Sequence, residues 1–118
     1  MAPSILLVDD DPDIRLALTD LLEHHGYRVD SNSTGAQAIE KAKVDRLSAV
    51  ILDLTLPDGD GIAVLRVLKE TVPATPIIIL TGSNHRATAL QNGAFAFLLK
   101  PWNREELLDV LSRAMATA

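Results

Sequence analysis

Polar residues that could do chemistry follow four short apolar runs in this sequence. They are Asp9, Asp10, Asp53, Thr81 and Lys100. Two carboxylates about 4 Å apart repel each other by about 4 kcal/mol at an effective dielectric constant of about 20. If the three aspartates meet beside one lysine, the cluster should therefore take up protons or bind a cation. Oxygen ligands select a hard cation, and a few carboxylates with positions left for water suit Mg²⁺ better than Ca²⁺. The sequence thus predicts a Mg²⁺ site.

A Mg²⁺ ion, an ammonium group and a hydroxyl group around one free carboxylate would form a phosphoryl-transfer site. The cation and Lys100 would neutralise oxygens of the incoming phosphoryl group, and Thr81 would donate a hydrogen bond to it. Asp53 would then be the nucleophile and would form an aspartyl phosphate. A single aspartate at a strand end is more simply a turn residue, so this prediction depends on the elements that bring these residues together.

The apolar runs alternate with segments of helical period, which predicts five strand–helix units in one chain. The predicted strands span residues 4–8, 27–30, 49–52, 77–80 and 95–99. The predicted helices begin at Pro12 after an Asp11 cap, after Ser33 or Thr34, near Gly61, near His85 and after Asn103. This alternation indicates a doubly wound α/β sheet of parallel strands with helices on both faces. The carboxyl ends of such strands share one edge, where ligands bind.

Other residues have structural interpretations. Asp58 and Asp60 flank glycines and are predicted to be turn residues, because apolar residues occupy the positions where a calcium-binding loop would continue its ligands. Helical spacing predicts buried positions in four of the five helices, and these include Ala17, Ala36 and Met115. Leu108 belongs to the same predicted buried set.

The composition predicts one folded domain over residues 1–118. Hydrophobic residues make up 47% of the chain, and there is no cysteine for disulfides, thiolate metal sites or thiol nucleophiles. A net charge of -5 argues against a basic face that binds nucleic acid. The apolar runs are too short to span a membrane, and the first residues do not resemble a signal peptide, so a cytoplasmic protein is expected.

In chain order, the sequence contains Leu7-Val8-Asp9-Asp10, Leu52-Asp53 with Pro57 and Gly61, Leu80-Thr81-Gly82 and Leu99-Lys100-Pro101. This ordered set resembles the receiver domain of bacterial two-component response regulators, and the resemblance covers almost the whole chain. It implies a flavodoxin-like fold with strand order 2-1-3-4-5. It also implies that the chain accepts a phosphoryl group from a sensor histidine kinase or a phosphotransfer protein. Such a domain switches its output surface and turns over no external substrate.

The resemblance implies particular roles for the acidic residues. Asp53 corresponds to the phosphoacceptor. Asp10 and Asp53 correspond to direct Mg²⁺ ligands, together with the backbone carbonyl of Thr55, and Asp9 corresponds to a ligand that acts through metal-bound water. Thr55 and Ser83 stand at positions that tune dephosphorylation in similar domains.

The resemblance also implies a switch. Thr81 and Lys100 correspond to the pair that senses the phosphoryl group. Phe97 matches an aromatic position whose side chain turns inward when the threonine moves towards that group. The Lys100-Pro101 peptide bond is cis in similar domains, and a proline makes that isomer accessible.

Two features depart from the family pattern. The interval from Thr81 to Lys100 is about three residues shorter than in the family, which is about one helical turn and predicts a short or displaced fourth helix. Receivers dock an effector domain or a second copy through the fourth helix, fifth strand and fifth helix, so this departure concerns the output face. Trp102 stands where a smaller aromatic residue is expected.

Three alternative functions compete with this interpretation. One is a phosphorylation-independent receiver-like module for protein interaction, although the complete set of site residues counts against it. A Mg²⁺-dependent phosphatase would carry a second aspartate two positions after its nucleophile, where Thr55 stands. A flavin carrier would need aromatic side chains for stacking, and only 3% of the residues are aromatic. The sequence does not identify the kinase or the output.

Overall fold

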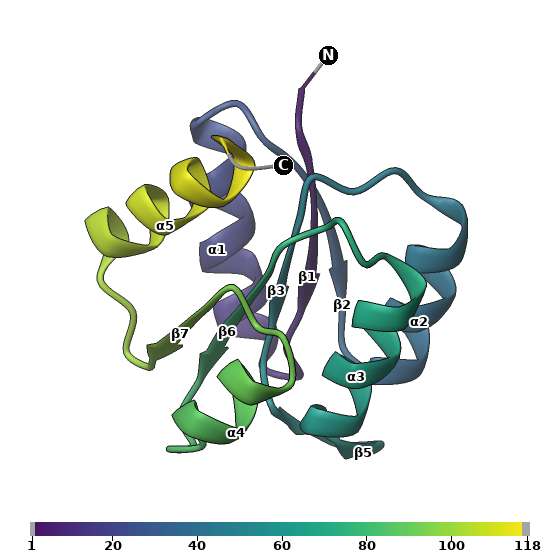
Figure 1. Cartoon of the computed structure of the whole chain (residues 1–118). Helices are drawn as coiled ribbons and strands as arrows, with labels where there is room; N and C mark the ends of the chain where they lie inside the picture. The colour runs from purple at the N-terminus through teal and green to yellow at the C-terminus, as the bar shows by residue number, and fades with distance from the viewer. Residues whose placement is uncertain (1, 117–118) are drawn as a thin grey trace.

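Five parallel strands form the central sheet of the computed structural model, in which residues 2–116 are described (Figure 1). The strands are β1 (Ser4–Val8), β2 (Arg28–Asn32), β3 (Ala49–Leu52), β6 (Ile77–Thr81) and β7 (Ala96–Leu99). Their order is β2-β1-β3-β6-β7, which confirms the expected doubly wound order. The first and third strands of the chain therefore lie side by side, at the point where the strand order reverses.

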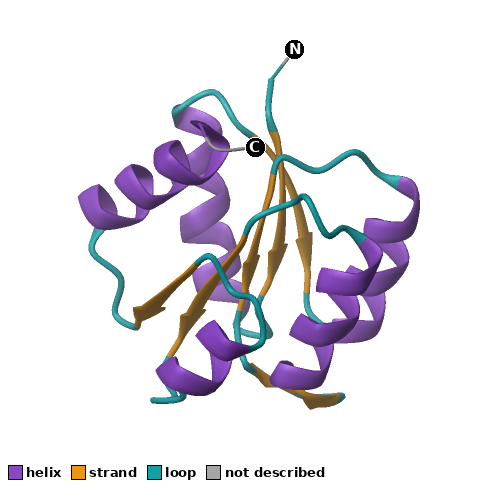
Figure 2. Cartoon of the chain, viewed as in Figure 1, coloured by secondary structure: helices purple, strands orange, loops and turns teal. Residues whose placement is uncertain are grey.

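Helices cover both faces of this sheet (Figure 2). One face carries α1 (Pro12–His24) and α5 (Arg104–Ala116), and the other carries α2 (Gly35–Val44), α3 (Gly61–Thr71) and α4 (Arg86–Gln91). The strands β3 and β6 are buried along their whole length, which explains why their sequences are unbroken apolar runs. Within residues 2–116, no helix is both long enough and apolar enough to cross a membrane.

Side chains cap three of the helices where the sequence predicts. Asp11, Thr34 and Asn103 each accept a hydrogen bond from a backbone N–H group two or three residues further on, at 2.9, 3.2 and 3.0 Å. A side-chain oxygen at this position satisfies a backbone donor that has no partner within the helix. These caps define where α1, α2 and α5 begin, and hence how the chain leaves the strand ends.

A short antiparallel hairpin lies between β3 and α3, and the sequence predicts only a turn there. It consists of β4 (Thr55–Leu56) and β5 (Gly59–Asp60). Strands of two residues are too short to show an alternating pattern. The turn requires Gly59, whose φ of 149° lies in a region that favours glycine. The prediction for β2 is also shifted, because this strand begins one residue later than predicted and continues to Asn32.

Some helices present a slightly different face to the sheet than the spacing predicts. Ala17 and Ala36 are exposed, and Leu108 and Met115 are only partly buried. In α5, Val110 is buried although it was not in the predicted set. An alanine has little apolar area to remove from water, so the exposure of Ala17 and Ala36 costs little.

Gly61 allows α3 to start against the chain that leaves β3. A Cβ atom at Gly61 would lie 2.3 Å from the Cα atom and from the carbonyl oxygen of Leu54. The variant Gly61→Ala should therefore lower the free energy of unfolding by about 1–3 kcal/mol, measured by urea denaturation. Gly82→Ala is the matched control, because a Cβ atom there would meet nothing within 4 Å. Equal stabilities of the two variants would contradict this packing.

Candidate functional site

The ends of β1 and β3 bring three carboxylates together. Asp9 follows β1 and Asp53 follows β3, and the two residues are only 2% and 3% exposed. The N–H group of Asp53 donates a hydrogen bond to the carbonyl of Val8 at 2.9 Å, which joins the two strand ends. Asp10 is exposed beside them. One carboxylate oxygen from each aspartate lies within 4.8 Å of the others, as the sequence predicts.

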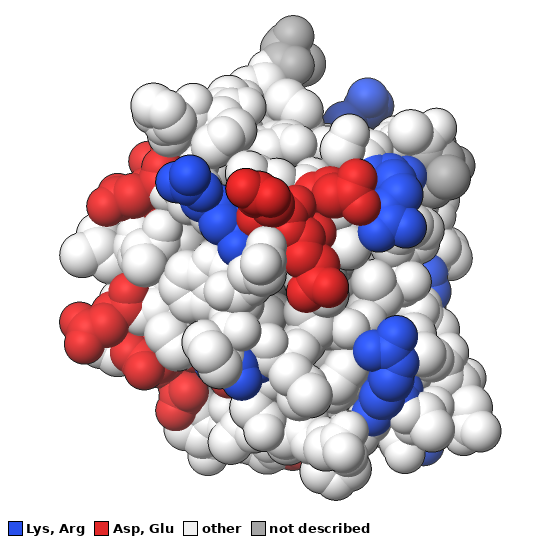
Figure 3. Space-filling view, turned by 90° about the vertical axis from the view of Figure 1, so that its left-hand side faces the viewer, with Lys and Arg blue, Asp and Glu red and all other residues white. Residues whose placement is uncertain are grey.

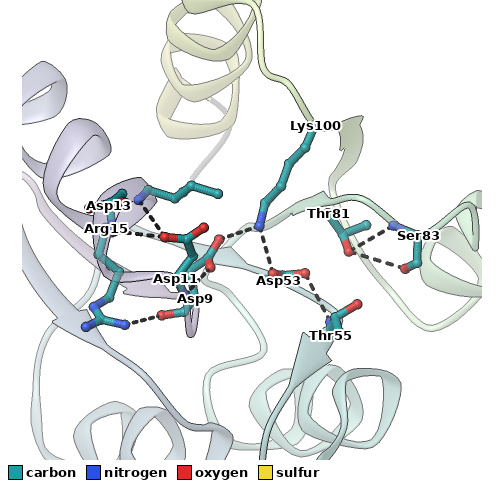
Figure 4. Close-up of polar contacts among 10 residues, drawn as sticks. Asp9, Asp11, Asp13, Arg15, Asp53, Thr55, Thr81, Ser83 and Lys100 are labelled. Atoms are coloured by element: carbon teal, nitrogen blue, oxygen red, sulfur yellow. Dashed lines mark hydrogen bonds and ion pairs between the residues drawn. The ribbon is translucent and has the colours of Figure 1, made fainter.

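Lys100 reaches this cluster from the end of β7. Its Nζ atom lies 2.7 Å from Oδ2 of Asp9 and 2.9 Å from Oδ2 of Asp53 (Figure 4). The N–H group of Lys100 donates to the carbonyl of Thr81 at 2.8 Å, and the Lys100-Pro101 bond is cis, as expected. One ammonium group is therefore shared between two buried carboxylates.

Burial and pairing act in opposite directions on the pKa values of Asp9 and Lys100. Burial raises the pKa of Asp9 above its ordinary value, although the hydrogen bonds from Lys100 and from the N–H group of Asp11 oppose the rise. Burial would lower the pKa of Lys100, but hydrogen bonds to Asp53 and Asp9 hold that pKa above its ordinary value. The lysine stays charged, and its single charge only partly offsets the cost of burying two carboxylates. Further positive charge would stabilise the site.

The second oxygen of Asp53 is also bonded. Its Oδ1 atom accepts a hydrogen bond from the N–H group of Thr55 at 3.0 Å, at the start of β4. Thr81 is fully buried at the end of β6, but its hydroxyl oxygen lies 3.2 Å from Oγ of Ser83 and accepts from the N–H group of Ser83 at 3.3 Å. Figure 4 shows Thr81 on the side of Asp53 opposite to Asp9. Thr81 therefore shares the sheet edge with Asp53, and its hydroxyl group bonds within its own loop.

Two arginines contact the site region and were not singled out from the sequence. Nη1 of Arg15 donates to the carbonyl oxygen of Asp9 at 2.7 Å. Nη1 of Arg86 donates to the carbonyl oxygen of Phe97 at 3.2 Å, and its Cζ atom lies 6.0 Å from the centre of the buried Phe97 ring. Each arginine lies in the first turn of a helix that follows a strand of the site, and that position is the signal that could have indicated them.

Other predicted features lie outside the cluster. Asp30 pairs with Lys41 at 3.3 Å on the edge strand and takes no part in the carboxylate cluster. The helix α4 is short, as the interval before Lys100 predicts. Trp102 is half-buried and packs against the core on the α1 and α5 face.

The donor set fits a divalent cation. The cluster offers oxygen ligands, and hard cations such as Mg²⁺ prefer oxygen. Asp10 is exposed, so water can fill the positions that the protein leaves open. The ammonium group of Lys100 already forms ion pairs with the carboxylates of Asp9 and Asp53, so the site accommodates positive charge. These features define a doubly wound α/β domain with an acidic centre at the carboxyl edge of its sheet.

Comparison with known proteins gives the family. The model of the response regulator receiver domain matches residues 5–112. The chain is 34% identical over 116 residues to the C4-dicarboxylate transport transcriptional regulatory protein DctD of Rhizobium meliloti (strain 1021). This alignment covers 96% of the chain and 25% of DctD. It is 39% identical over 111 residues to response regulator MprA of Mycobacterium ulcerans (strain Agy99), and this alignment covers 92% of the chain and 48% of MprA. The chain thus spans at most about half the length of these curated relatives.

Solved structures agree with this. A CheY-like receiver domain protein from Methanospirillum hungatei JF-1 has a TM-score of 0.95 at 28% identity, with 98% of this chain and 95% of that chain covered. The receiver domain of sensor histidine kinase PA1611 from Pseudomonas aeruginosa PAO1 has a TM-score of 0.90 at 34% identity, with 98% and 99% covered, and holds a magnesium ion in its active-site cleft. The chain belongs to the response regulator receiver domain family of two-component signalling.

Replacing Lys100 by Met would leave two buried carboxylates without their cation. At neutral pH and without divalent cations, we expect Lys100→Met to lower the free energy of unfolding by about 3 kcal/mol. Lys100 opposes the rise that burial causes in the pKa of Asp9, so this pKa should be raised further in Lys100→Met than in wild type, and the folded variant should take up its proton at a higher pH. The deficit should therefore shrink as the pH falls towards the ordinary aspartate pKa of 3.8. Urea unfolding at a series of pH values measures this.

Lys43→Met is the matched control, because Lys43 makes an exposed ion pair with Glu40 at 3.2 Å. Its loss should change the free energy of unfolding by less than about 1 kcal/mol. If Lys100→Met costs no more than Lys43→Met, or if its deficit does not depend on pH, the electrostatic description of the site is wrong.

Proposed function

We propose that Asp53 is the phosphoacceptor of this receiver domain and takes its phosphoryl group from the phosphohistidine of a sensor histidine kinase or a phosphotransfer protein. An oxygen of the Asp53 carboxylate would form the new bond to phosphorus. The bond from phosphorus to the imidazole nitrogen would break, and its electron pair would stay on the imidazole. The observation that supports this is the place of Asp53 at the sheet edge, where it lies beside the carboxylates of Asp9 and Asp10 and pairs with Lys100.

Mg²⁺ would be held by Asp9, Asp10 and Asp53, together with the backbone carbonyl of Thr55. When bound, it supplies positive charge that neutralises oxygens of the phosphoryl group. The carboxylates of this chain are suited to hold it, because Lys100 alone leaves an excess of negative charge at the site.

Lys100 and Thr81 would respond to the new phosphoryl group. The ammonium group of Lys100 already lies 2.9 Å from Asp53, so it can pair with phosphoryl oxygens with little movement. The hydroxyl group of Thr81 would exchange its contact with Ser83 for a hydrogen bond to the same group. The loop after β6 and Phe97 would follow, as a two-state change with a coupling free energy of about 1–3 kcal/mol.

The output surface in this proposal is the face of α4, β7 and α5, which would dock an effector domain or a second copy of the chain. Leu90, Phe95 and Leu99 are 40%, 40% and 49% exposed there. Figure 3, which views the molecule from the side of α5 and β7, shows uncharged surface between acidic and basic side chains. The chain would act as one receiver domain in the cytoplasm and would turn over no external substrate.

Intact-mass spectrometry after incubation with phosphoramidate tests the acceptor directly. Wild-type protein should gain one phosphoryl group in the presence of Mg²⁺ and none when Mg²⁺ is chelated. Asp53→Asn should gain none, because the amide is a poor nucleophile. Thr81→Ala is the control variant and should still be phosphorylated, since Thr81 only senses the group.

Phosphorylation of Asp53→Asn to the wild-type extent would place the acceptor elsewhere and contradict the proposal. An addition that is independent of Mg²⁺ would contradict the role of the metal.

A further inference from the structure

Asp58 lies in the turn between β4 and β5, and the chemistry proposed above does not use it. Its Oδ1 atom accepts a hydrogen bond from the N–H group of Gly35 at 3.0 Å, and its Oδ2 atom accepts from the N–H group of Ala36 at 3.0 Å. These are the first two N–H groups of α2, while the cap residue Thr34 satisfies the N–H group of Gln37. Asp58 is therefore a second cap for α2, supplied by a distant part of the chain.

The local sequence is suited to this contact. A Cβ atom at Gly35 would lie 2.5 Å from Cγ2 of Val64, so the absence of a side chain lets α2 begin close to α3 and to the hairpin. The two hydrogen bonds from the N–H groups of Gly35 and Ala36 lower the pKa of Asp58 below its ordinary value. The carboxylate is thus charged at neutral pH and faces the positive end of the helix dipole.

The segment from Asp53 to Gly61, which contains the β4–β5 hairpin, is attached at both of its ends. At the start, the side chain of Asp53 accepts from the N–H group of Thr55 at 3.0 Å. At the end, the N–H group of Gly61 donates to the carbonyl of Leu54 at 3.1 Å. Asp58 holds the tip between these points, and Thr55 pairs with the opposite strand of the hairpin. The backbone of Thr55 therefore lies in a segment that is held at its start, at its tip and at its end.

We propose that Asp58 is a positioning residue for the metal site, because it holds the tip of the β4–β5 hairpin on α2 and so fixes the backbone carbonyl of Thr55. This inference rests on the function proposed above, in which that carbonyl is a Mg²⁺ ligand. Asp58 acts through the hairpin and contacts α2 instead of the carboxylate cluster. Its loss should weaken Mg²⁺ binding before any phosphoryl transfer takes place.

Isothermal titration calorimetry with Mg²⁺ alone tests this on the whole chain. Asp58→Asn should raise the Mg²⁺ dissociation constant about tenfold, the lower end of the usual effect of residues that orient metal ligands. Asp58→Glu keeps the charge but moves it by one methylene group, so it should also weaken binding. Asp45→Asn, at the other end of α2, removes the same charge from an exposed residue and should bind like wild type.

Amide hydrogen exchange of Gly35 and Ala36, followed by NMR, reports whether the cap is broken and whether each variant folds. Faster exchange in Asp58→Asn together with wild-type Mg²⁺ affinity would overturn the inference. Weak binding by Asp58→Asn but wild-type binding by Asp58→Glu would also overturn it, because charge alone would then explain the effect. If Asp58→Asn does not fold, Asp58→Glu carries the same test.

The failure of the proposed function would look different. Wild-type protein that does not bind Mg²⁺, or that is not phosphorylated on Asp53, would contradict the metal site itself and with it the role of Asp58. Normal wild-type binding and phosphorylation, with no change in Mg²⁺ affinity in either Asp58 variant, would overturn only the positioning role.

Discussion

The ammonium group of Lys100 between the carboxylates of Asp9 and Asp53 is the interaction on which the site depends. Two carboxylates buried at adjacent strand ends would be costly without a partner, because an uncompensated buried charge destabilises a fold by several kcal/mol. The lysine offsets part of this cost and leaves the pKa of Asp9 raised. The same imbalance that costs stability would favour binding of a cation at this acidic cluster.

The strand order makes this interaction possible. β1 and β3 are neighbours, so their terminal aspartates meet, while β7 is separated from β3 by β6. The long side chain of Lys100 spans that separation and reaches Asp53. Thr81 stands at the end of β6, the strand between β3 and β7. The polar side chains of the site thus come from the ends of four strands, with Asp9 and Asp10 both following β1, and the buried sheet holds their backbones in fixed positions.

The strands and the convergence of Asp9, Asp53 and Lys100 could be predicted because unbroken apolar runs end at each polar residue. The order of the strands came from the family resemblance, since periodicity alone does not order a sheet. The β4–β5 hairpin and the bonds from Asp58 to α2 could not be predicted. They join segments far apart in the chain, and a turn residue gives no local sign of a distant partner. The exposed Ala17 shows a similar limit, because alanine adds little to a hydrophobic pattern.

The pKa of the Asp9 carboxyl group, followed by carbon NMR of its side-chain carboxyl carbon with and without Mg²⁺, tests this balance most directly. If Lys100 only partly offsets burial, the pKa of Asp9 without metal lies above the ordinary value of 3.8 and falls when Mg²⁺ binds. A pKa of Asp9 at or below the ordinary value without metal would contradict the electrostatic imbalance. A raised pKa that saturating Mg²⁺ leaves unchanged would show that the carboxylate cluster is not the metal site.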